Sequence, residues 1–362
     1  MDHVRIDDVQ ARLEEQGMAS ASLQLDGGGT LVACQRGGRL MPFAADGESV
    51  LWLSRAWAER ERFEAFLARG DWNLGGERTW IAPEIQFTIR DRRDFWGSYS
   101  LPAAMDPGTW RLEPARDGGC ALRQEAELAA HNLAAGVKRL RVQRFVRSVA
   151  DPVRSLRQGA CADVSFMGYE HDTVVRDLEP NAIGAQSWNL IQLVPGGSVF
   201  LPLLAPAVQR DYFEPVGEER QRLADDLVEL SITGAHRYKV GYGAAYHVGR
   251  VGYVRALDPS RARLLVRAFF NNPSTSYLEE PASKPGENGD SVHVYNDDGN
   301  AGGFGEIECY GQALGGEGGR VVSSDTTVLW VYTGGFEGVA QVARTLLGAA
   351  AGRRVTRLLG VS

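Results

Sequence analysis

Several short segments of the chain set ionisable and aromatic side chains among glycine and apolar residues. Carboxylates and imidazoles on rigid strands can move protons, and indole or phenol rings beside them can bind a ligand that has an apolar face and polar groups. We expect five of these segments to meet across one face of a sheet: residues 80–87, 168–172, 236–241, 293–299 and 306–311.

The clearest pair of candidate groups is Glu306 and Glu308. In a strand, residues two apart share a face, so these carboxylates point together while Ile307 and Cys309 point the other way. Two neighbouring carboxylates raise each other's pKa, which suits a base that works near neutral pH. The alternative is a pair of solvated charges on an exposed sheet face.

Signatures of metals and cofactors are absent from the sequence. It has no P-loop, no GxGxxG after a strand, no HExxH and no GxSxG. None of the six histidines forms an i, i+4 pair on a helix, so no metal site and no cofactor are predicted. Asp290, Asp297 and Asp298 could hold a divalent ion, but an acidic loop tip in solvent is the better interpretation.

The elements that must position these groups are mostly strands. Helices are expected over residues 1–20, 54–69 and 336–349, and a long loop over 281–303. Between them lie short apolar or alternating runs bounded by glycine, proline and asparagine: 23–25, 30–34, 137–142, 190–194, 199–203, 264–266 and 328–331. The pattern predicts a mainly β protein, a large antiparallel β-sandwich with a few short helices. We expect one domain over residues 1–362, with a helical extension at about 1–20.

Composition excludes several classes of partner. The 362 residues are 44% hydrophobic and 23% charged, with a net charge of −7, which argues against a nucleic-acid binder. The basic cluster at 138–147 is interpreted as a solvated strand face. There is no apolar run of 18 residues and no secretory leader at the start, so no membrane partner is expected. The four cysteines lack CxxC spacing and are predicted to be reduced thiols in a cytoplasmic protein.

The order of the motifs carries a family resemblance. A W-I-x-P-E segment at Trp80–Glu84 precedes His236–Gly241, which is similar to a Y-R-x-K-I/V-G strand; Tyr295–Gly299 and the pair Glu306 and Glu308 follow. Over about residues 50–350 the chain resembles an uncharacterised bacterial family with the galactose-mutarotase-like (aldose 1-epimerase-like) β-supersandwich fold. It departs from the pattern in His236, where the family has Tyr, in an extra Asp in the loop, and in the Cys-Tyr-Gly that follows Glu308.

The resemblance implies a carbohydrate ligand and an enzyme of the mutarotase or epimerase type. Glu308 is similar in position to the general base of the mutarotases, and His236 and His293 are its candidate partners. Opening a pyranose needs a base at the O1 hydroxyl and an acid at the ring oxygen. The candidate substrate-binding residues are Trp80, Glu84, Glu170, Trp188, Arg237, Lys239, Tyr295 and Asn296.

Other interpretations remain open. A glycoside hydrolase or lyase on the same fold would use Glu308 with Glu84 or Glu170 as a carboxylate pair. A non-catalytic sugar-binding or sensing module would have an aromatic groove and a Glu308 held in a salt bridge. Trp80 and Trp188 are also good core residues, because tryptophan is highly buried on average.

Overall fold

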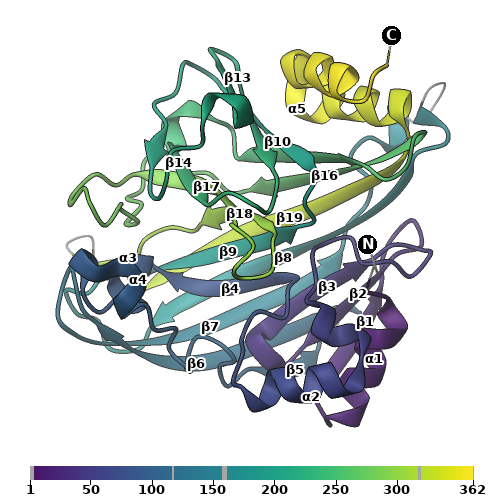
Figure 1. Cartoon of the computed structure of the whole chain (residues 1–362). Helices are drawn as coiled ribbons and strands as arrows, with labels where there is room; N and C mark the ends of the chain where they lie inside the picture. Colours follow the sequence, from purple (N-terminus) through teal and green to yellow (C-terminus); the bar gives the residue numbers. More distant parts are fainter. Residues whose placement is uncertain (1–3, 116–117, 157–160, 317–318, 362) are drawn as a thin grey trace.

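The computed structural model describes residues 4–115, 118–156, 161–316 and 319–361. Short apolar and alternating runs form two large antiparallel sheets, which Figure 1 shows stacked on each other. The predicted mainly β sandwich with few short helices is therefore confirmed. Strands from distant parts of the chain are neighbours in each sheet. Side chains that are far apart in the sequence therefore come together on one face.

The first sheet has nine strands and carries most of the candidate residues. In spatial order its strands are β1 (Ser20–Gln24), β2 (Thr30–Cys34), β3 (Arg39–Phe43), β4 (Glu77–Ala82), β9 (Gln186–Leu193), β18 (Gly305–Tyr310), β17 (Asp290–Asn296), β14 (Tyr238–Gly243) and β11 (Arg210–Asp211). Strand β17 crosses the segment 281–303, so the prediction of one long loop there is wrong for Asp290–Asn296.

The second sheet has ten strands. In spatial order they are β12 (Gln221–Ala224), β13 (Leu227–Ile232), β10 (Gly197–Pro202), β15 (Arg250–Ala256), β16 (Arg261–Phe269), β19 (Val322–Gly335), β8 (Ser165–Asp177), β7 (Gly136–Ser148), β6 (Cys120–Ala130) and β5 (Arg111–Pro114). Buried and exposed residues alternate along β6 and β7, as expected for strands with one face inside.

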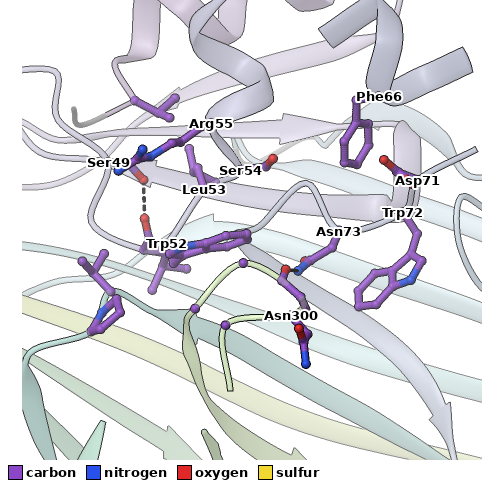
Figure 2. A pocket seen from close by; sticks show the side chains of 18 residues that line it. Ser49, Trp52, Leu53, Ser54, Arg55, Phe66, Asp71, Trp72, Asn73 and Asn300 are labelled. Carbon is purple, nitrogen blue, oxygen red and sulfur yellow. Dashed lines mark hydrogen bonds between the residues drawn. The ribbon is translucent and has the colours of Figure 1, made fainter. Parts of the chain in front are cut away.

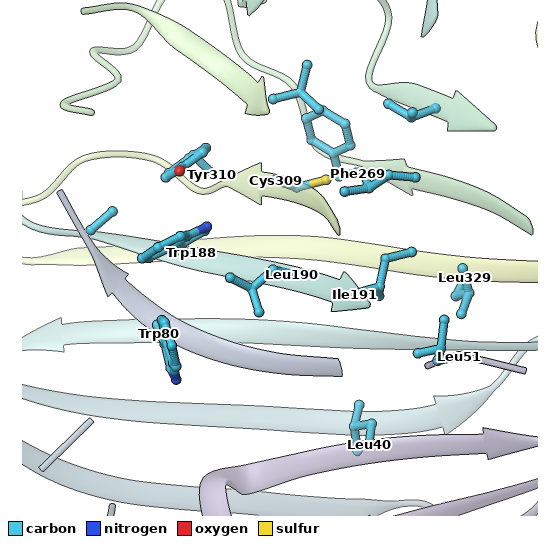
Figure 3. Close-up of a cluster of buried hydrophobic side chains, with 14 of the residues drawn as sticks. Leu40, Leu51, Trp80, Trp188, Leu190, Ile191, Phe269, Cys309, Tyr310 and Leu329 are labelled. Carbon is cyan, nitrogen blue, oxygen red and sulfur yellow. The ribbon is translucent and has the colours of Figure 1, made fainter. Parts of the chain in front are cut away.

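The main core lies between the two sheets. Ile191 of β9, Cys309 of β18 and Leu329 of β19 belong to one cluster of buried side chains (Figure 3). The alternation predicted for β18 holds, since Ile307 and Cys309 join this core while Glu306 and Glu308 face the other side.

Charges are also buried between the sheets. The Glu77 carboxylate accepts hydrogen bonds from Arg267 at 2.8 Å and from Arg144 at 3.1 Å, and it contacts Tyr169 and His171 as well. The interpretation of residues 138–147 as a solvated face is therefore wrong for Arg144, and equally for Lys138, which pairs with Asp177 at 2.5 Å. Burying an unpaired charge is costly, and each of these buried cations has a carboxylate partner that offsets this cost.

The helices are short except for one at the end. They are α1 (Ile6–Glu15), α2 (Arg60–Ala68), α3 (Glu84–Phe87), α4 (Phe95–Ser98) and α5 (Phe336–Leu358), with a 3₁₀ turn at Arg55–Ala58 before α2. The first predicted helix is shorter than 1–20, because β1 begins at Ser20; residues 1–3 lie outside the described residues.

The last helix extends beyond the predicted 336–349. It is interrupted at Gly348, whose φ of 90° breaks the helical backbone. Its apolar side chains, among them Val339 and Leu347, pack with residues of β10, β15, β16 and β19. Among the described residues, no helix has the length and apolar character needed to span a membrane.

Candidate functional site

A pocket of about 190 Å³ opens on the nine-stranded sheet, on the face opposite the main core. Five neighbouring strands, β4, β9, β18, β17 and β14, each contribute at least one side chain to its wall. The register explains why these side chains share a face: Trp80 lies opposite Trp188, and Tyr295 lies opposite both Glu306 and Lys239. The described lining residues are Trp72, Arg78, Trp80, Glu84, Trp96, Tyr99, Trp188, Phe213, Lys239, Tyr295, Ala301, Phe304, Glu306 and Glu308.

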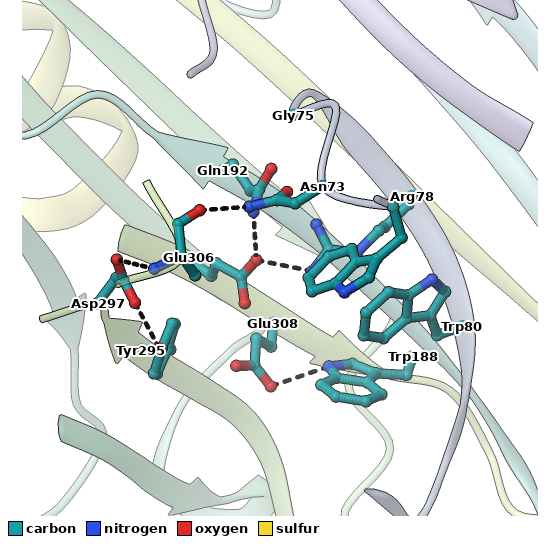
Figure 4. Close-up of polar contacts among 12 residues, drawn as sticks. Asn73, Gly75, Arg78, Trp80, Trp188, Gln192, Tyr295, Asp297, Glu306 and Glu308 are labelled. Carbon is teal, nitrogen blue, oxygen red and sulfur yellow. Dashed lines mark hydrogen bonds and ion pairs between the residues drawn. The ribbon is translucent and has the colours of Figure 1, made fainter. Parts of the chain in front are cut away.

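Glu308 sits at the centre of a hydrogen-bond network in the pocket wall. Its Oε2 accepts from Trp188 Nε1 at 2.9 Å and from the Tyr310 hydroxyl at 3.0 Å (Figure 4 shows the Trp188 contact). The ammonium of Lys239 lies 3.0 Å from the same oxygen. One carboxylate oxygen therefore meets three donors, which fixes the orientation of the group.

Glu306 forms a second polar centre on the same strand. Its Oε1 accepts from Arg78 Nη2 at 2.9 Å and from Gln192 Nε2 at 3.0 Å (Figure 4). The guanidinium of Arg78 lies over the ring of Trp80 at 4.2 Å, a cation–π contact. Burial raises the pKa of Glu306 to about 7, against the opposing charge of Arg78 and together with the charge of Glu308.

The third carboxylate of the pocket, Glu84, begins the short helix α3 and also meets Lys239, at 3.1 Å. Burial raises the pKa of Glu84, and Lys239 opposes that shift. For Lys239, burial alone would lower the pKa, but the charges of Glu308 and Glu84 outweigh it and raise the pKa.

A fourth buried carboxylate, Glu279, contacts Glu84 but is not among the described lining residues of the pocket. Its Oε2 accepts from the Glu84 backbone N–H at 2.6 Å, and its side chain is buried. Burial raises the pKa of Glu279 to about 8, while Lys239 opposes the shift and the charge of Glu84 adds to it. A carboxyl group that changes its protonation near neutral pH thus lies next to the pocket.

The two histidines predicted to be partners of Glu308 do not line the pocket. His293 lies opposite Glu308 on the neighbouring strand and is fully buried; its Nδ1 lies 3.8 Å from Glu308 Oε2 and 3.0 Å from the Tyr310 hydroxyl, which donates to Glu308. Burial holds the pKa of His293 well below its usual range. His236 is half-buried before β14, and its Nε2 lies 3.1 Å from the Pro215 carbonyl.

Six of the eight predicted substrate-binding residues lie in or beside the pocket. Trp80, Glu84, Trp188, Lys239 and Tyr295 line it. Arg237 lies at the rim, where its guanidinium stacks over the lining residue Trp96 at 4.4 Å.

The other two predicted residues lie elsewhere. Asn296 accepts from the backbone N–H groups of Thr233 and Gly234 and donates to the His236 carbonyl, so it holds the turn before β14. Glu170 belongs to β8 of the ten-stranded sheet and pairs with Arg147.

Five segments were predicted to meet on one sheet face, and four of them contribute side chains to the pocket: 80–87, 236–241, 293–299 and 306–311. Segment 168–172 does not join the pocket, because β8 pairs with β7 and β19 in the other sheet. Its inward side chains, Tyr169 and His171, contact Glu77 between the sheets instead. The order of the five segments in the sequence could not show to which sheet β8 belongs.

Several lining residues had no role predicted from the sequence. Arg78 could have been found, because it lies two residues before Trp80 and so shares its face. Trp72, Tyr99, Phe213 and Phe304 come from loops, whose approach to the sheet has no periodic signal. Glu279 also lies in a loop that the sequence pattern does not mark.

The described part of the chain contains no group of three His, Cys, Asp or Glu residues that could hold a metal ion. The acidic residues of the loop after β17 have other partners. Asp297 accepts from the backbone N–H groups of Gly299, Ala301 and Gly303, and Asp298 pairs with Arg237.

Comparison with solved structures finds proteins with a similar course of the chain. A putative aldose 1-epimerase from Escherichia coli K12 is 13% identical, with a TM-score of 0.48 over 87% of this chain and 99% of its own. A galactose mutarotase-like protein from Lactobacillus casei ATCC 334 is 9% identical, with a TM-score of 0.43 over 86% and 100%. The Slr1438 protein from Synechocystis sp. PCC 6803 is 13% identical, with a TM-score of 0.48 over 88% and 96%. Similarities at this level say nothing about activity.

Comparison of sequences gives the family. No curated protein matches the chain. Residues 21–351 match a family described as a family of unknown function, DUF6786. The prediction of an uncharacterised family is thereby confirmed, and because the match spans most of the chain, this protein belongs to the DUF6786 family.

Proposed function

We propose that the pocket binds a small sugar and that its carboxylates act on that sugar by general acid–base catalysis, as a mutarotase or epimerase does. A sugar ring presents apolar C–H faces and several hydroxyls. The half-exposed indole ring of Trp96 offers a flat apolar surface for these faces, and the buried rings of Trp80 and Trp188 add apolar edges to the pocket wall. Glu84, Glu306 and Lys239 offer acceptors and a donor for the hydroxyls.

The observation that carries the proposal is that Glu306 and Glu308 point into one pocket from one strand. Each is paired with a buried cation, Glu308 with Lys239 and Glu306 with Arg78, and burial raises the pKa of Glu306 to about 7. A carboxyl group with a raised pKa next to a second carboxylate suits the two halves of acid–base catalysis. In the proposed reaction Glu308 takes the proton of the O1 hydroxyl while Glu306 gives a proton to the ring oxygen, which opens the ring.

A second candidate function is sugar binding without turnover. One observation in its favour is the ion pair between Lys239 and Glu308, because an ammonium at 3.0 Å makes the Glu308 carboxylate a weaker base. Another is that the described lining residues include no histidine. Glycoside hydrolysis is less well supported. It needs two carboxyl groups with substrate between them, but Lys239 stands between Glu84 and Glu308, and Glu170 lies in the other sheet.

The test combines binding with turnover. A panel of reducing monosaccharides is titrated into the protein by calorimetry, and anomer interconversion of each ligand is then followed by NMR. Binding together with accelerated interconversion supports the enzyme. Binding without acceleration supports the second candidate, and no binding across the panel contradicts both.

A further inference from the structure

A second, larger cavity adjoins the pocket. It has a volume of about 800 Å³, and Trp72 and Ala301 line both it and the pocket. Figure 2 shows Trp52 and Trp72 with Asn73 and Asn300 around this cavity, between the N-terminal segments and the loop that follows β17. Trp72 and Ala301 therefore form the wall that the two spaces share, the junction between them.

The volumes differ in what they can hold. Pockets for small ligands usually measure about 300–1,000 Å³. The pocket, at about 190 Å³, is smaller than this range, whereas the adjoining cavity lies within it. A ligand that extends from the pocket past the junction would find this larger space beyond it.

The cavity wall has the chemistry of a surface that binds carbohydrate. The rings of Trp52 and Trp72 supply apolar faces, and Ser54, Asp71 and Asn300 supply hydrogen-bonding groups. Trp52 also packs against Phe304, a lining residue of the pocket, with ring centres 4.9 Å apart. Aromatic surfaces therefore continue from the pocket into the cavity.

One atom in the cavity wall lacks a hydrogen-bond partner among the described residues. The side-chain Nδ2 of Asn73 donates to the carbonyl of Ala301 at 3.0 Å, while its Oδ1 is buried and unpaired. Buried polar atoms are nearly always hydrogen-bonded, so such an acceptor points to a group that binds there. A hydroxyl of a ligand passing the junction would supply the donor once the Asn73 side chain turns this oxygen toward the cavity.

From these observations we infer that the protein takes an oligosaccharide, with the reducing-end ring in the pocket and the following rings in the cavity. The inference rests on the proposed function. A reaction at O1 requires that the reducing-end ring keep its anomeric hydroxyl free beside Glu306 and Glu308. The rest of the ligand must then leave that ring through another hydroxyl, past Trp72 and Ala301.

Calorimetry of the full chain tests the inference with reducing mono-, di- and trisaccharides built from glucose, galactose and mannose. At least one trisaccharide should bind tenfold or more tightly than the monosaccharide of its reducing end. Trp52→Ala should weaken trisaccharide binding by at least tenfold, and by much more than monosaccharide binding. Trp52→Phe, which keeps an aromatic face, should retain most of the affinity. Val248→Ala, an exposed site outside both spaces, is the control.

The outcomes separate the two proposals. Equal affinities for mono- and trisaccharides would overturn the inference while sugar binding stands. An equal loss of both affinities in Trp52→Ala would also overturn it, because Trp52 would then act only on the shape of the pocket. If none of the sugars binds, the proposed function fails and the inference with it.

Discussion

The ammonium of Lys239 lies 3.0 Å from Oε2 of Glu308 and stands 4.6 Å from the centre of the Trp188 ring. It also meets Glu84 at 3.1 Å, so a single buried cation balances two carboxylates at the bottom of the pocket. This arrangement makes Lys239 the residue on which the charge balance of the site depends. A buried ion pair is costly to form but costlier to break, because the remaining charge has no partner.

Replacing Lys239 with methionine should therefore destabilise the protein. The expected loss in the free energy of unfolding is about 3–5 kcal/mol at pH 8. The loss should shrink at pH 5, where Glu84, whose pKa burial already raises, can take up a proton. Chemical denaturation measures both values. The control is Lys284→Met, which removes an exposed ion pair with Glu287 and should change stability little. Equal effects of the two substitutions would contradict the account.

The buried charges between the sheets give a second prediction. Burial alone would raise the pKa of Glu77, but the charges of Arg267, His171 and Arg144 outweigh burial and hold the pKa well below its usual range. Glu77→Gln should leave two buried guanidinium groups without a counter-charge and cost about 3–5 kcal/mol in the free energy of unfolding.

The matched control for Glu77→Gln is Glu125→Gln. Glu125 pairs with Arg141 across β6 and β7 at 2.6 Å, on the exposed side of the ten-stranded sheet. Its loss should cost about 0–1 kcal/mol. Denaturation curves that shift equally for both variants would show that the cluster around Glu77 contributes no special stability.

Stability should depend on pH through Glu279. Its folded pKa is raised to about 8 from an ordinary value of 4.5, chiefly by burial. The folded state therefore binds this proton more tightly than the unfolded state. The stability gained is fully present below about pH 4.5 and is lost as pH rises through about 8.

Glu279→Gln isolates this contribution, because glutamine does not ionise. Relative to this variant, the wild type should lose up to about 1.4 kcal/mol per pH unit between pH 5 and 8. Denaturation at several pH values measures the difference. Parallel curves for the two proteins would mean that the pKa of Glu279 is not raised in the folded state.

Local patterns in the sequence predicted the faces of strands well. Glu306 and Glu308 share a face because strand side chains alternate, and the structure confirms this directly. Trp80, Glu84 and Lys239 reach the same pocket, as the order of motifs suggested. These relationships depend on spacing within a few residues, which a single sequence shows.

Relationships that depend on strand order could not be predicted in this way. Glu170 lies in a polar, glycine-bounded segment much like the others, yet β8 joins the ten-stranded sheet. Asn296 belongs to β17 of the nine-stranded sheet, but its amide holds the turn at Thr233 and Gly234. The pairing of strands far apart in sequence, such as β8 with β19, is decided by contacts across the whole chain, and a single segment carries no local signal for it.

The central claim is that Glu308 is the base of a sugar-converting pocket, and its most direct test is the rate of anomer interconversion in Glu308→Gln. Glutamine keeps the size and much of the hydrogen bonding but cannot take a proton. We predict that the variant still binds the sugar and that its turnover falls by about 10²-fold or more, the usual yield of general acid–base catalysis. Glu125→Gln, on the exposed face of the other sheet, should keep the wild-type rate. Turnover at the wild-type rate in Glu308→Gln would contradict the claim.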